Sequence, residues 1–387
     1  MKKVAIVSCY FKKNYGSMLQ AYATQKVLDN EGIDNETINI EENVDFKKGK
    51  NSFYKSQIFN FSFIKSKMGM IKLKVDKKVN KKLHENLSIR DKEFEKFKSK
   101  FRLTKPFHTY NEMTEECNKY SNVVVGSDQL WLPVNVVADY YTLNWVPDEI
   151  NKISYATSFG LSVIPEKYKE KYSNFLKRIN HISVREKNAC KLVEDLSGRK
   201  AELVCDPTLL LNKEEWMEIQ QEKPIIDGKY ILCYFLGKNI QHRKFAERLK
   251  EKTGCKIVSL NHSDEYVKYS DKFADETPYN IGPGEFVNLI RNAEYVCTDS
   301  FHGTVFSLIN NVEFFTFERF SSKNSKVSTN SRIYSLLDLV GLQNRLLKGY
   351  EEIDNIINKK IDFSEVNDKI KTFRNNSKEF LKNSLIK

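Results

Sequence analysis

The sequence has little that would cross-link the chain or bind a metal. Its seven cysteines are scattered, and no two of them stand in a Cys-x-x-Cys spacing. An odd number with irregular spacing supports neither a disulfide framework nor a structural zinc site, so we predict reduced cysteines in the core. An Asp-x-Asp motif is also missing. The sequence therefore predicts no bound metal.

Long apolar runs are missing as well. No window approaches the roughly 18 uncharged apolar residues of a membrane-spanning helix. The first apolar run, in "MKKVAIVSCYFKKNYGS", is only about six residues long, and polar Lys12, Lys13 and Asn14 follow it without a small-residue cleavage site. We interpret this run as a first β-strand and not as a signal peptide, and we expect a cytoplasmic protein.

Acidic residues are scarce in one segment. Residues 47–105 hold 19 Lys plus Arg against 5 Asp plus Glu, although the whole chain carries a net charge of only +12. Apolar residues recur between these lysines, which predicts a basic insert of one or two amphipathic helices. A solvated lysine face is the default interpretation. Peripheral contact with an anionic membrane at the inner face is the alternative, and no motif favours nucleic acid.

Elsewhere, apolar stretches with the period of strands alternate with stretches that have the period of helices. "KVAIVSCY" predicts a strand and "MLQAYATQKVLDNEG" a helix, and the alternation resumes after Phe107 and again after a polar stretch with Pro224 and Gly228. Such alternation is typical of parallel sheets covered by helices on both faces. With 387 residues, we predict two Rossmann-like α/β lobes, residues 1–220 and 221–345, and a helical segment 346–387 that crosses back to the first lobe.

Ligands of open α/β sheets bind beyond the carboxyl ends of the strands. Polar residues follow the predicted strands at these ends, including Asn14 to Ser17, Ser127 and Asp128, Arg185, and His302. Asp128 could accept a sugar hydroxyl or cap the next segment. Arg185 could bind a carboxylate or phosphate, or pair with Glu186 at the surface. Asp206, before Pro207, is expected to fix a turn.

His302 is the histidine with the most informative setting. It follows the strand in "EYVCTDS" and lies in the first turn of the next predicted helix, where an imidazole can exchange protons beside an anion site. The alternative is that it only caps its own helix. His84, His108, His242 and His262 lie in polar stretches.

These motifs together resemble the bacterial polysaccharide pyruvyl transferase family, in family order from about residue 3 to 345. The resemblance is carried by "NYGSMLQAYA", "VVVGSDQLW", "SYATSFG", "SVRE", "CDPTLLL", "IGPGEFVNLIRNAEYVCTDSFHGTVFSL" and "STNSRIYSLLDLVGL". It implies a GT-B-like fold of two lobes. It also implies transfer of pyruvate from phosphoenolpyruvate to a sugar diol of a cell-surface polysaccharide precursor, giving a ketal and phosphate, with no cofactor besides this co-substrate.

The resemblance also implies roles for particular residues. We expect His302, Arg185 and Asp128 to be catalytic, with the general base left open among Asp128, Glu186 and Asp299. Many family members carry an arginine where this chain has Ser300, so Arg319 or Arg332 is expected to supply the missing cation. The predicted donor-binding set is Arg185, Ser300, Phe301, His302, Gly303, Arg319 and Arg332. The predicted acceptor-binding set is Asn14, Tyr15, Gly16, Ser17, Gln20, Ser127, Asp128, Gln129, Ser158, Phe159 and Gly160.

Two other functions remain open on the sequence. A GT-B glycosyltransferase that uses a nucleotide sugar would have the same fold, because fold does not fix function. A non-catalytic binder of polyanions would use residues 47–105, and its affinity would fall steeply with salt whether or not His302 is changed. The acceptor is expected to be a glycan, with attachment to a lipid left open.

Overall fold

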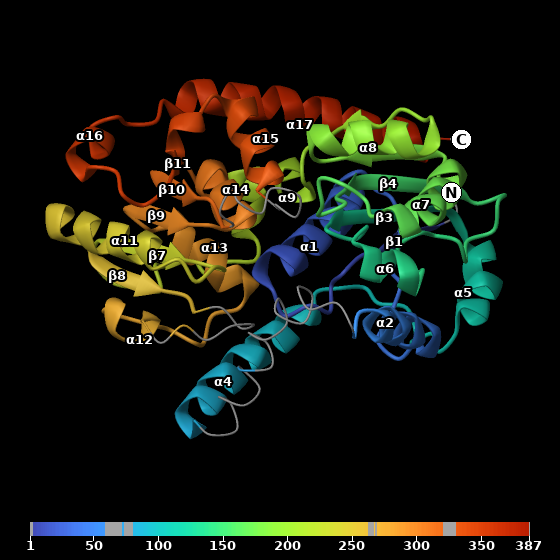
Figure 1. Cartoon of the computed structure of the whole chain (residues 1–387), viewed down its shortest axis with the longest axis horizontal. Helices are drawn as coiled ribbons and strands as arrows, with labels where there is room; N and C mark the ends of the chain where they lie inside the picture. Colours follow the sequence, from blue (N-terminus) through green and yellow to red (C-terminus); the bar gives the residue numbers. More distant parts are fainter. Residues whose placement is uncertain are drawn as a thin grey trace.

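The computed structural model describes residues 3–58, 72, 80–261, 267, 269–319 and 330–386. These residues form two lobes, each built on a parallel sheet, and helices pack against both sheets (Figure 1). The predicted α/β class with two parallel sheets is confirmed. The middle part of the predicted basic insert, residues 59–71 and 73–79, lies outside the described residues, so the insert as a whole stays a prediction.

The first lobe contains a six-stranded sheet. Its strand order is β2-β1-β3-β4-β5-β6, and every neighbouring pair is parallel. All seven residues of β4 and most of β3 are buried, as expected for strands that carry helices on both faces. The strands are β1 (Lys3–Val7), β2 (Asn35–Thr37), β3 (Tyr120–Asp128), β4 (Asn151–Thr157), β5 (His181–Val184) and β6 (Glu202–Leu203).

The helices of this half include two from the basic segment, α2 and α4. Figure 1 shows α4 extending away from the body of the first lobe, below the second. The helices are α1 (Tyr15–Asn30), α2 (Val44–Ser56), α4 (Lys81–Lys98), α5 (Tyr110–Glu116), α6 (Pro133–Ala138), α7 (Glu166–Arg178), α8 (Lys187–Ser197), α9 (Pro207–Leu210) and α10 (Lys213–Met217), with a 3-10 turn at Cys117–Lys119.

The second lobe contains a five-stranded parallel sheet of order β11-β10-β9-β7-β8. Its strands are β7 (Tyr230–Tyr234), β8 (Lys256–Ser259), β9 (Tyr295–Thr298), β10 (Phe314–Phe317) and β11 (Leu346–Leu347). The remaining helices are α11 (Ile240–Thr253), α12 (Ser270–Phe273), α13 (Pro283–Arg291), α14 (Phe301–Asn310), α15 (Ser331–Val340), α16 (Ile353–Ile357) and α17 (Phe363–Leu385), with a 3-10 turn at Gln343–Arg345.

One hydrophobic core joins the lobes. It holds residues of β1, α1 and β4 together with residues of β7, β9, α13 and α14, whereas two further clusters lie within one lobe each. At the seam, the ring of Tyr15 stacks on Phe286 with centroids 4.6 Å apart, and its hydroxyl donates to the carbonyl of Ile281 at 3.0 Å. The lobes are therefore packed against each other and not merely tethered.

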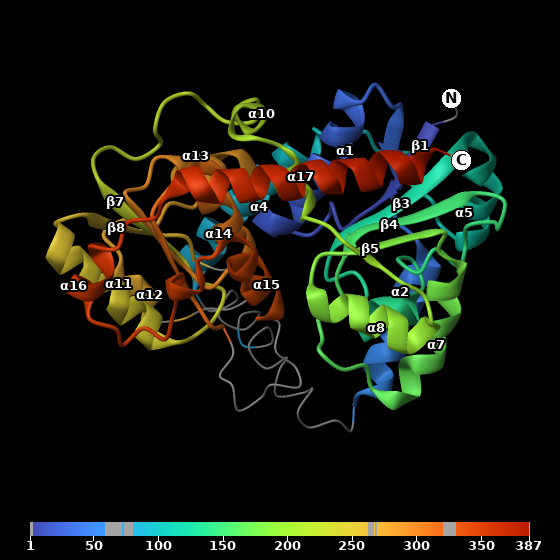
Figure 2. The same cartoon turned by 90° about the horizontal axis from the view of Figure 1, so that it is seen from above.

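The long helix α17 spans both lobes, as the sequence predicts for the last segment (Figure 2). It begins after the second lobe and ends on the first sheet, where Asn122 and Asn151 donate to the carbonyls of Leu385 and Ser384. Midway, Ser377 accepts from the backbone of Cys205 at 2.9 Å. The helix thus fixes the relative position of the two sheets. None of the described helices is long and apolar enough to cross a membrane.

Candidate active site

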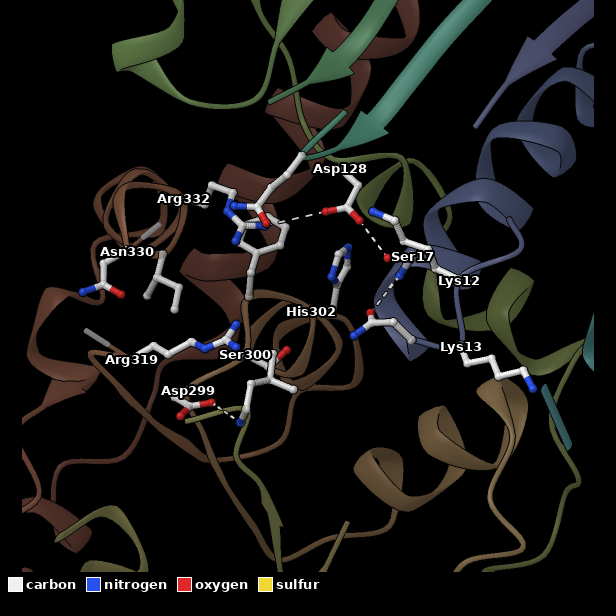
Figure 3. A pocket seen from close by; sticks show the side chains of 15 residues that line it. Lys12, Lys13, Ser17, Asp128, Asp299, Ser300, His302, Arg319, Asn330 and Arg332 are labelled. Atoms are coloured by element: carbon white, nitrogen blue, oxygen red, sulfur yellow. Dashed lines mark hydrogen bonds and ion pairs between the residues drawn. The ribbon is translucent and has the colours of Figure 1, made fainter. Parts of the chain in front are cut away.

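A cleft of about 390 Å³ opens where the carboxyl ends of strands from both sheets meet (Figure 3). The first lobe contributes the loop between β1 and α1 and the end of β3. The second lobe contributes the residues after β7, β9 and β10 and the start of α15. The lining residues are Lys12, Lys13, Asn14, Ser17, Asp128, Gln129, Leu236, Asp299, Ser300, Phe301, His302, Arg319, Asn330, Arg332 and Ile333.

Local capping explains how the two helices at the cleft begin. The side chain of Asn14 accepts from the backbone N–H of Ser17 at 3.1 Å, and the side chain of Ser300 accepts from Gly303 at 3.3 Å. Asn and Ser are preferred at this position because they satisfy helix N–H groups that have no helical partner. Helices α1 and α14 therefore both point their N-terminal ends, with their partial positive charge, at the cleft.

Asp128 is the carboxylate at the end of β3. Its Oδ2 accepts from Ser17 Oγ at 2.7 Å, and its Oδ1 lies 3.3 Å from Arg185 and 3.9 Å from Arg332. Burial alone would raise the pKa of Asp128, but the positive charges of Lys12, Arg185 and Arg332 outweigh burial and hold it well below its ordinary value. Asp128 is thus ionised at neutral pH, and 12% of its side chain remains exposed at the cleft.

Arg185 does not line the cleft, although the sequence predicts a direct contact with the donor. Its side chain is only 1% exposed. Its guanidinium lies behind Asp128 and contacts three carboxylates: Asp206 at 2.5 Å, Asp128 at 3.3 Å and Glu186 at 3.8 Å. The structure therefore places Arg185 beneath the cleft, as a countercharge to the carboxylates there.

Asp206 does more than fix the expected Asp-Pro turn. One oxygen, Oδ1, accepts from the backbone N–H and the hydroxyl of Thr208 at 3.0 and 2.7 Å, which starts α9. The other, Oδ2, accepts from Arg185 at 2.5 Å and from Ser127 at 3.0 Å. Burial opposes ionisation, but His302, Arg185 and Thr208 together hold the pKa of Asp206 well below its ordinary value.

His302 lies between the lobes, with its two ring nitrogens in different surroundings. Nε2 is buried, 3.7 Å from Asp206 Oδ1, and has no hydrogen-bond partner in the described part of the chain. Nδ1 lies beside Gly16, because a Cβ added to that glycine would stand 2.0 Å from it. Asn14 and Ser17, on either side of Gly16, line the cleft. Nε2 of the ring thus faces Asp206, and Nδ1 lies at the N-terminal end of α1.

Basic side chains dominate the rest of the cleft. Lys12 approaches from the first lobe, and Arg319 and Arg332 approach from the second (Figure 3). Lys13 also lines the cleft, but its Nζ points away and pairs with Asp91 at 3.2 Å. The guanidinium of Arg332 lies 5.7 Å from the ring of Phe301, and its Nε is buried without a hydrogen-bond partner among the described residues. Burial and the nearby charge of Arg185 lower the pKa of Arg332 to about 10, so it remains a cation at neutral pH. The cleft is suited to an anion.

The structure divides the predicted donor and acceptor residues into two groups. Asn14, Ser17, Asp128, Gln129, Ser300, Phe301, His302, Arg319 and Arg332 line the cleft. The others support it from behind: Gln20 accepts from the backbone of Ser127 at 2.8 Å, and Ser158 donates to Glu186 at 2.6 Å. Tyr15, Gly16, Phe159, Gly160 and Gly303 are also packed against protein.

The other candidate bases are less accessible than Asp128. Burial raises the pKa of Glu186, and its Oε1 is held by Ser158. Burial also raises the pKa of Asp299, whose two oxygens accept from the backbone N–H groups of Leu236 and Gly237 at 2.6 and 2.9 Å. Asp128 is therefore the carboxylate best placed to meet a ligand hydroxyl.

Sequence reasoning missed several members of the site. Lys12, Lys13, Leu236, Asn330 and Ile333 line the cleft but were not predicted to bind a ligand. The two lysines stand directly before Asn14, which was predicted to bind the acceptor, and this position is the signal that could have identified them. The described residues contain no group of three or more His, Cys, Asp or Glu side chains placed to hold a metal ion.

Comparison with known proteins points to one family. A family model described as polysaccharide pyruvyl transferase matches residues 14–322. No curated protein matches the sequence. Similar solved structures include UDP-GlcNAc 2-epimerases from Methanocaldococcus jannaschii (12% identity, TM-score 0.48, 97% of this chain and 93% of that chain) and Neisseria meningitidis (11%, 0.45, 96% and 99%). MurG from Acinetobacter baumannii is also similar (9%, 0.43, 98% and 98%).

Proposed function

The chain belongs to the polysaccharide pyruvyl transferase family, and from this premise we propose that it transfers pyruvate from phosphoenolpyruvate to two hydroxyls of a glycan precursor. The observation that carries the proposal is the cationic cleft around His302, to which Lys12, Arg319 and Arg332 contribute. Phosphoenolpyruvate carries up to three negative charges on a small frame. A donor of this kind matches a site with several cations and two helix N-termini.

The proposed reaction needs one proton donor and an arrangement that holds two hydroxyls. One sugar hydroxyl adds across the enol double bond, its oxygen bonding to C2 while C3 gains a proton and becomes a methyl group. The second hydroxyl then displaces phosphate at C2, and its proton leaves with the phosphate. Two C–O bonds form, one C–O bond to phosphate breaks, and nothing is oxidised or reduced.

The cleft contains a group for each of these tasks. His302 is the group that protonates the enol carbon, because an imidazole can donate a proton and this one lines the cleft. Arg332 and Arg319 bind the anionic donor, in place of the arginine that many family members have where Ser300 stands. Asp128 accepts a hydrogen bond from a sugar hydroxyl, since it is ionised and borders the cleft.

Thermal melting with several ligands tests this proposal without knowledge of the acceptor. A ligand at about 100 times its Kd should stabilise the wild type by roughly 2.7 kcal/mol. We expect phosphoenolpyruvate to raise the Tm, and Arg332→Gln to lose most of that rise. Lys169→Gln, at a half-exposed position of α7 that is not part of the cleft lining, is the matched control and should respond like the wild type.

The same experiment can reject the proposal. If UDP or GDP raises the Tm and phosphoenolpyruvate does not, the chain is a nucleotide-sugar glycosyltransferase that shares the fold. If phosphoenolpyruvate and inorganic phosphate stabilise equally in wild type and Arg332→Gln, the cleft does not select the donor as proposed. If phosphoenolpyruvate binds as proposed, release of phosphate from it on addition of glycans identifies the acceptors.

A further inference from the structure

Asp206 is held far more firmly than a turn requires. An Asp-Pro turn needs only the contacts of Oδ1 with Thr208. The second oxygen accepts from Arg185 at 2.5 Å and Ser127 at 3.0 Å, and the side chain is completely buried. Four donors therefore fix the position of one carboxylate directly under the cleft.

The arrangement leaves one edge of this carboxylate directed at His302. Oδ1 lies 3.7 Å from the buried Nε2, which is too long for a hydrogen bond but close enough for an ion pair. Nε2 has no other partner within the described structure. The backbone of Gly16 packs against the ring around Nδ1, where an added Cβ would stand 2.0 Å away, so position 16 has no room for a side chain. The ring thus has Asp206 facing Nε2 and the backbone of Gly16 beside Nδ1.

Charged groups from several elements surround the two carboxylates that interact with this imidazole. Asp128 at the end of β3 and Asp206 before α9 are negative, whereas Lys12 before α1, Arg185 after β5 and Arg332 on α15 are positive. Arg185 lies behind both carboxylates and offsets their charge. Among the residues that the structure describes, Asp206 is the acidic group with an atom within 4 Å of a ring nitrogen of His302.

We propose that Asp206 is a positioning residue, which keeps a proton on Nε2 of His302 and thereby leaves Nδ1 as the atom that exchanges a proton with the substrate. The inference deepens the proposed function and rests on it for the role of His302. In the transfer step, Nδ1–H gives its proton to C3 of the enol, whose double-bond electrons form the new C–H bond. The ring returns to its neutral form with the proton on Nε2. A hydroxyl proton released by the acceptor restores the Nδ1 proton.

A carboxylate behind an imidazole selects which nitrogen is protonated, and its loss can leave the geometry intact with the wrong tautomer. Asp206→Asn keeps the size of the side chain and an oxygen to accept from Thr208. The test compares ¹⁵N spectra of ring-labelled histidine in the wild type and in this variant, with the His302 signal identified by its loss in His302→Gln. The control is Thr208→Val, which removes a contact of 2.7 Å to Oδ1 but leaves the carboxylate charge.

In the wild type and in Thr208→Val, we expect the neutral ring to carry its proton on Nε2, which faces Asp206. In Asp206→Asn, we expect the neutral ring to carry its proton on Nδ1 in a substantial fraction of molecules. Phosphate release with an acceptor should fall at least about 100-fold, as for other misplaced tautomers.

Three outcomes would overturn the inference. The first is a wild-type spectrum in which the neutral ring of His302 is protonated on Nδ1. This outcome overturns the inference even if Asp206→Asn does not fold. An unchanged tautomer in a folded Asp206→Asn would show that Asp206 is only a structural cap, and so would a tautomer change of the same size in Thr208→Val. Because the spectra need no ligand, they separate this result from failure of the wild type to bind phosphoenolpyruvate, which would reject the proposed function instead.

Discussion

Replacing Gly16 with alanine should disable the cleft while the protein stays folded. A Cβ at this position would lie 2.0 Å from Nδ1, 2.4 Å from Cγ and 2.6 Å from Cε1 of His302, whereas ordinary contact begins near 3.4 Å. Gly16 lies in the first turn of α1, so its backbone cannot yield without disturbing the helix start. We therefore expect the imidazole to move by about 1 Å or more.

The size of the effect follows from two opposing terms. Alanine is the better helix former by roughly 1 kcal/mol, whereas overpacking costs roughly 1 to 3 kcal/mol, so the net change in the free energy of unfolding should stay within about 2 kcal/mol. A displacement of 1 Å in a catalytic group can cost about 100-fold in rate. We expect a similar loss in affinity for phosphoenolpyruvate if His302 contacts the donor.

Thermal melting with and without phosphoenolpyruvate measures both the stability of the variant and its affinity for the donor. At a concentration that stabilises the wild type by about 2.7 kcal/mol, a 100-fold weaker Kd leaves only about 0.4 kcal/mol. Gly198→Ala is the control, because Gly198 has φ +71 and no atom within 4 Å of a built Cβ. This control should lose about 1 kcal/mol of stability and keep the full response to the ligand.

A double variant tests the cause. Adding His302→Ala to Gly16→Ala removes the clash. The double variant should therefore lose less free energy of unfolding than the two single variants lose in total. The reasoning is refuted if Gly16→Ala binds phosphoenolpyruvate as tightly as the wild type, or if the two changes are simply additive in stability.

The remaining predictions concern charge and pH. Burial lowers the pKa of His242 to about 4, so the unfolded chain takes up its proton first. The free energy of unfolding should thus fall by up to roughly 3 kcal/mol between about pH 6.5 and pH 4. His242→Phe keeps the stacking on Phe317, and denaturant titrations should show that its free energy of unfolding falls less over this pH range. An equally large fall would show that His242 is not its cause. Asp128→Asn removes a negative charge from the cleft and should tighten phosphoenolpyruvate binding about tenfold in calorimetry, with weaker binding as the contrary result. The ion pair of Lys187 and Asp338 joins the lobes at the surface, where solvent screens it, and Lys187→Ala should leave the Tm unchanged.

The placement of His302 could be predicted because it depends on local order. A strand followed at once by a helix puts the first-turn residue at the carboxyl end of the sheet, and β9 and α14 follow that rule. Asp128, the last residue of β3, and Asn14, the N-cap of α1, lie at the carboxyl end of their sheet for the same reason. The fold class could be predicted for the same reason, because strand-period and helix-period stretches that alternate along the chain determine a parallel sheet covered by helices.

Arg185 shows where this reasoning stops. It follows β5, as predicted, but its side chain direction depends on Asp128 and Asp206, which stand 57 and 21 residues away in the sequence. Spacing along one chain does not reveal such pairs. As residue types, the cleft lysines do not stand out among the 63 Lys plus Arg of the chain, so only their position directly before Asn14 could have identified them.

His242 was interpreted as a polar-stretch residue because Gln241, Arg243 and Lys244 surround it. The helix period carried better information. His242, Phe245, Ala246 and Leu249 stand at i, i+3, i+4 and i+7, and all four are buried on one face of α11. Periodicity, rather than the nearest neighbours, would have predicted its burial.

The position of α17 has a consequence for synthesis on the ribosome. The last strand of the first sheet ends at Leu203, but Asn122 and Asn151 of that sheet find their partners only at Leu385 and Ser384. About 180 residues lie between, which take roughly 10 to 35 s to make at 5 to 20 residues per second. During that interval the first lobe presents an uncovered apolar seam to the cell. The helix that ties the two lobes together is therefore among the last parts of the protein that can form.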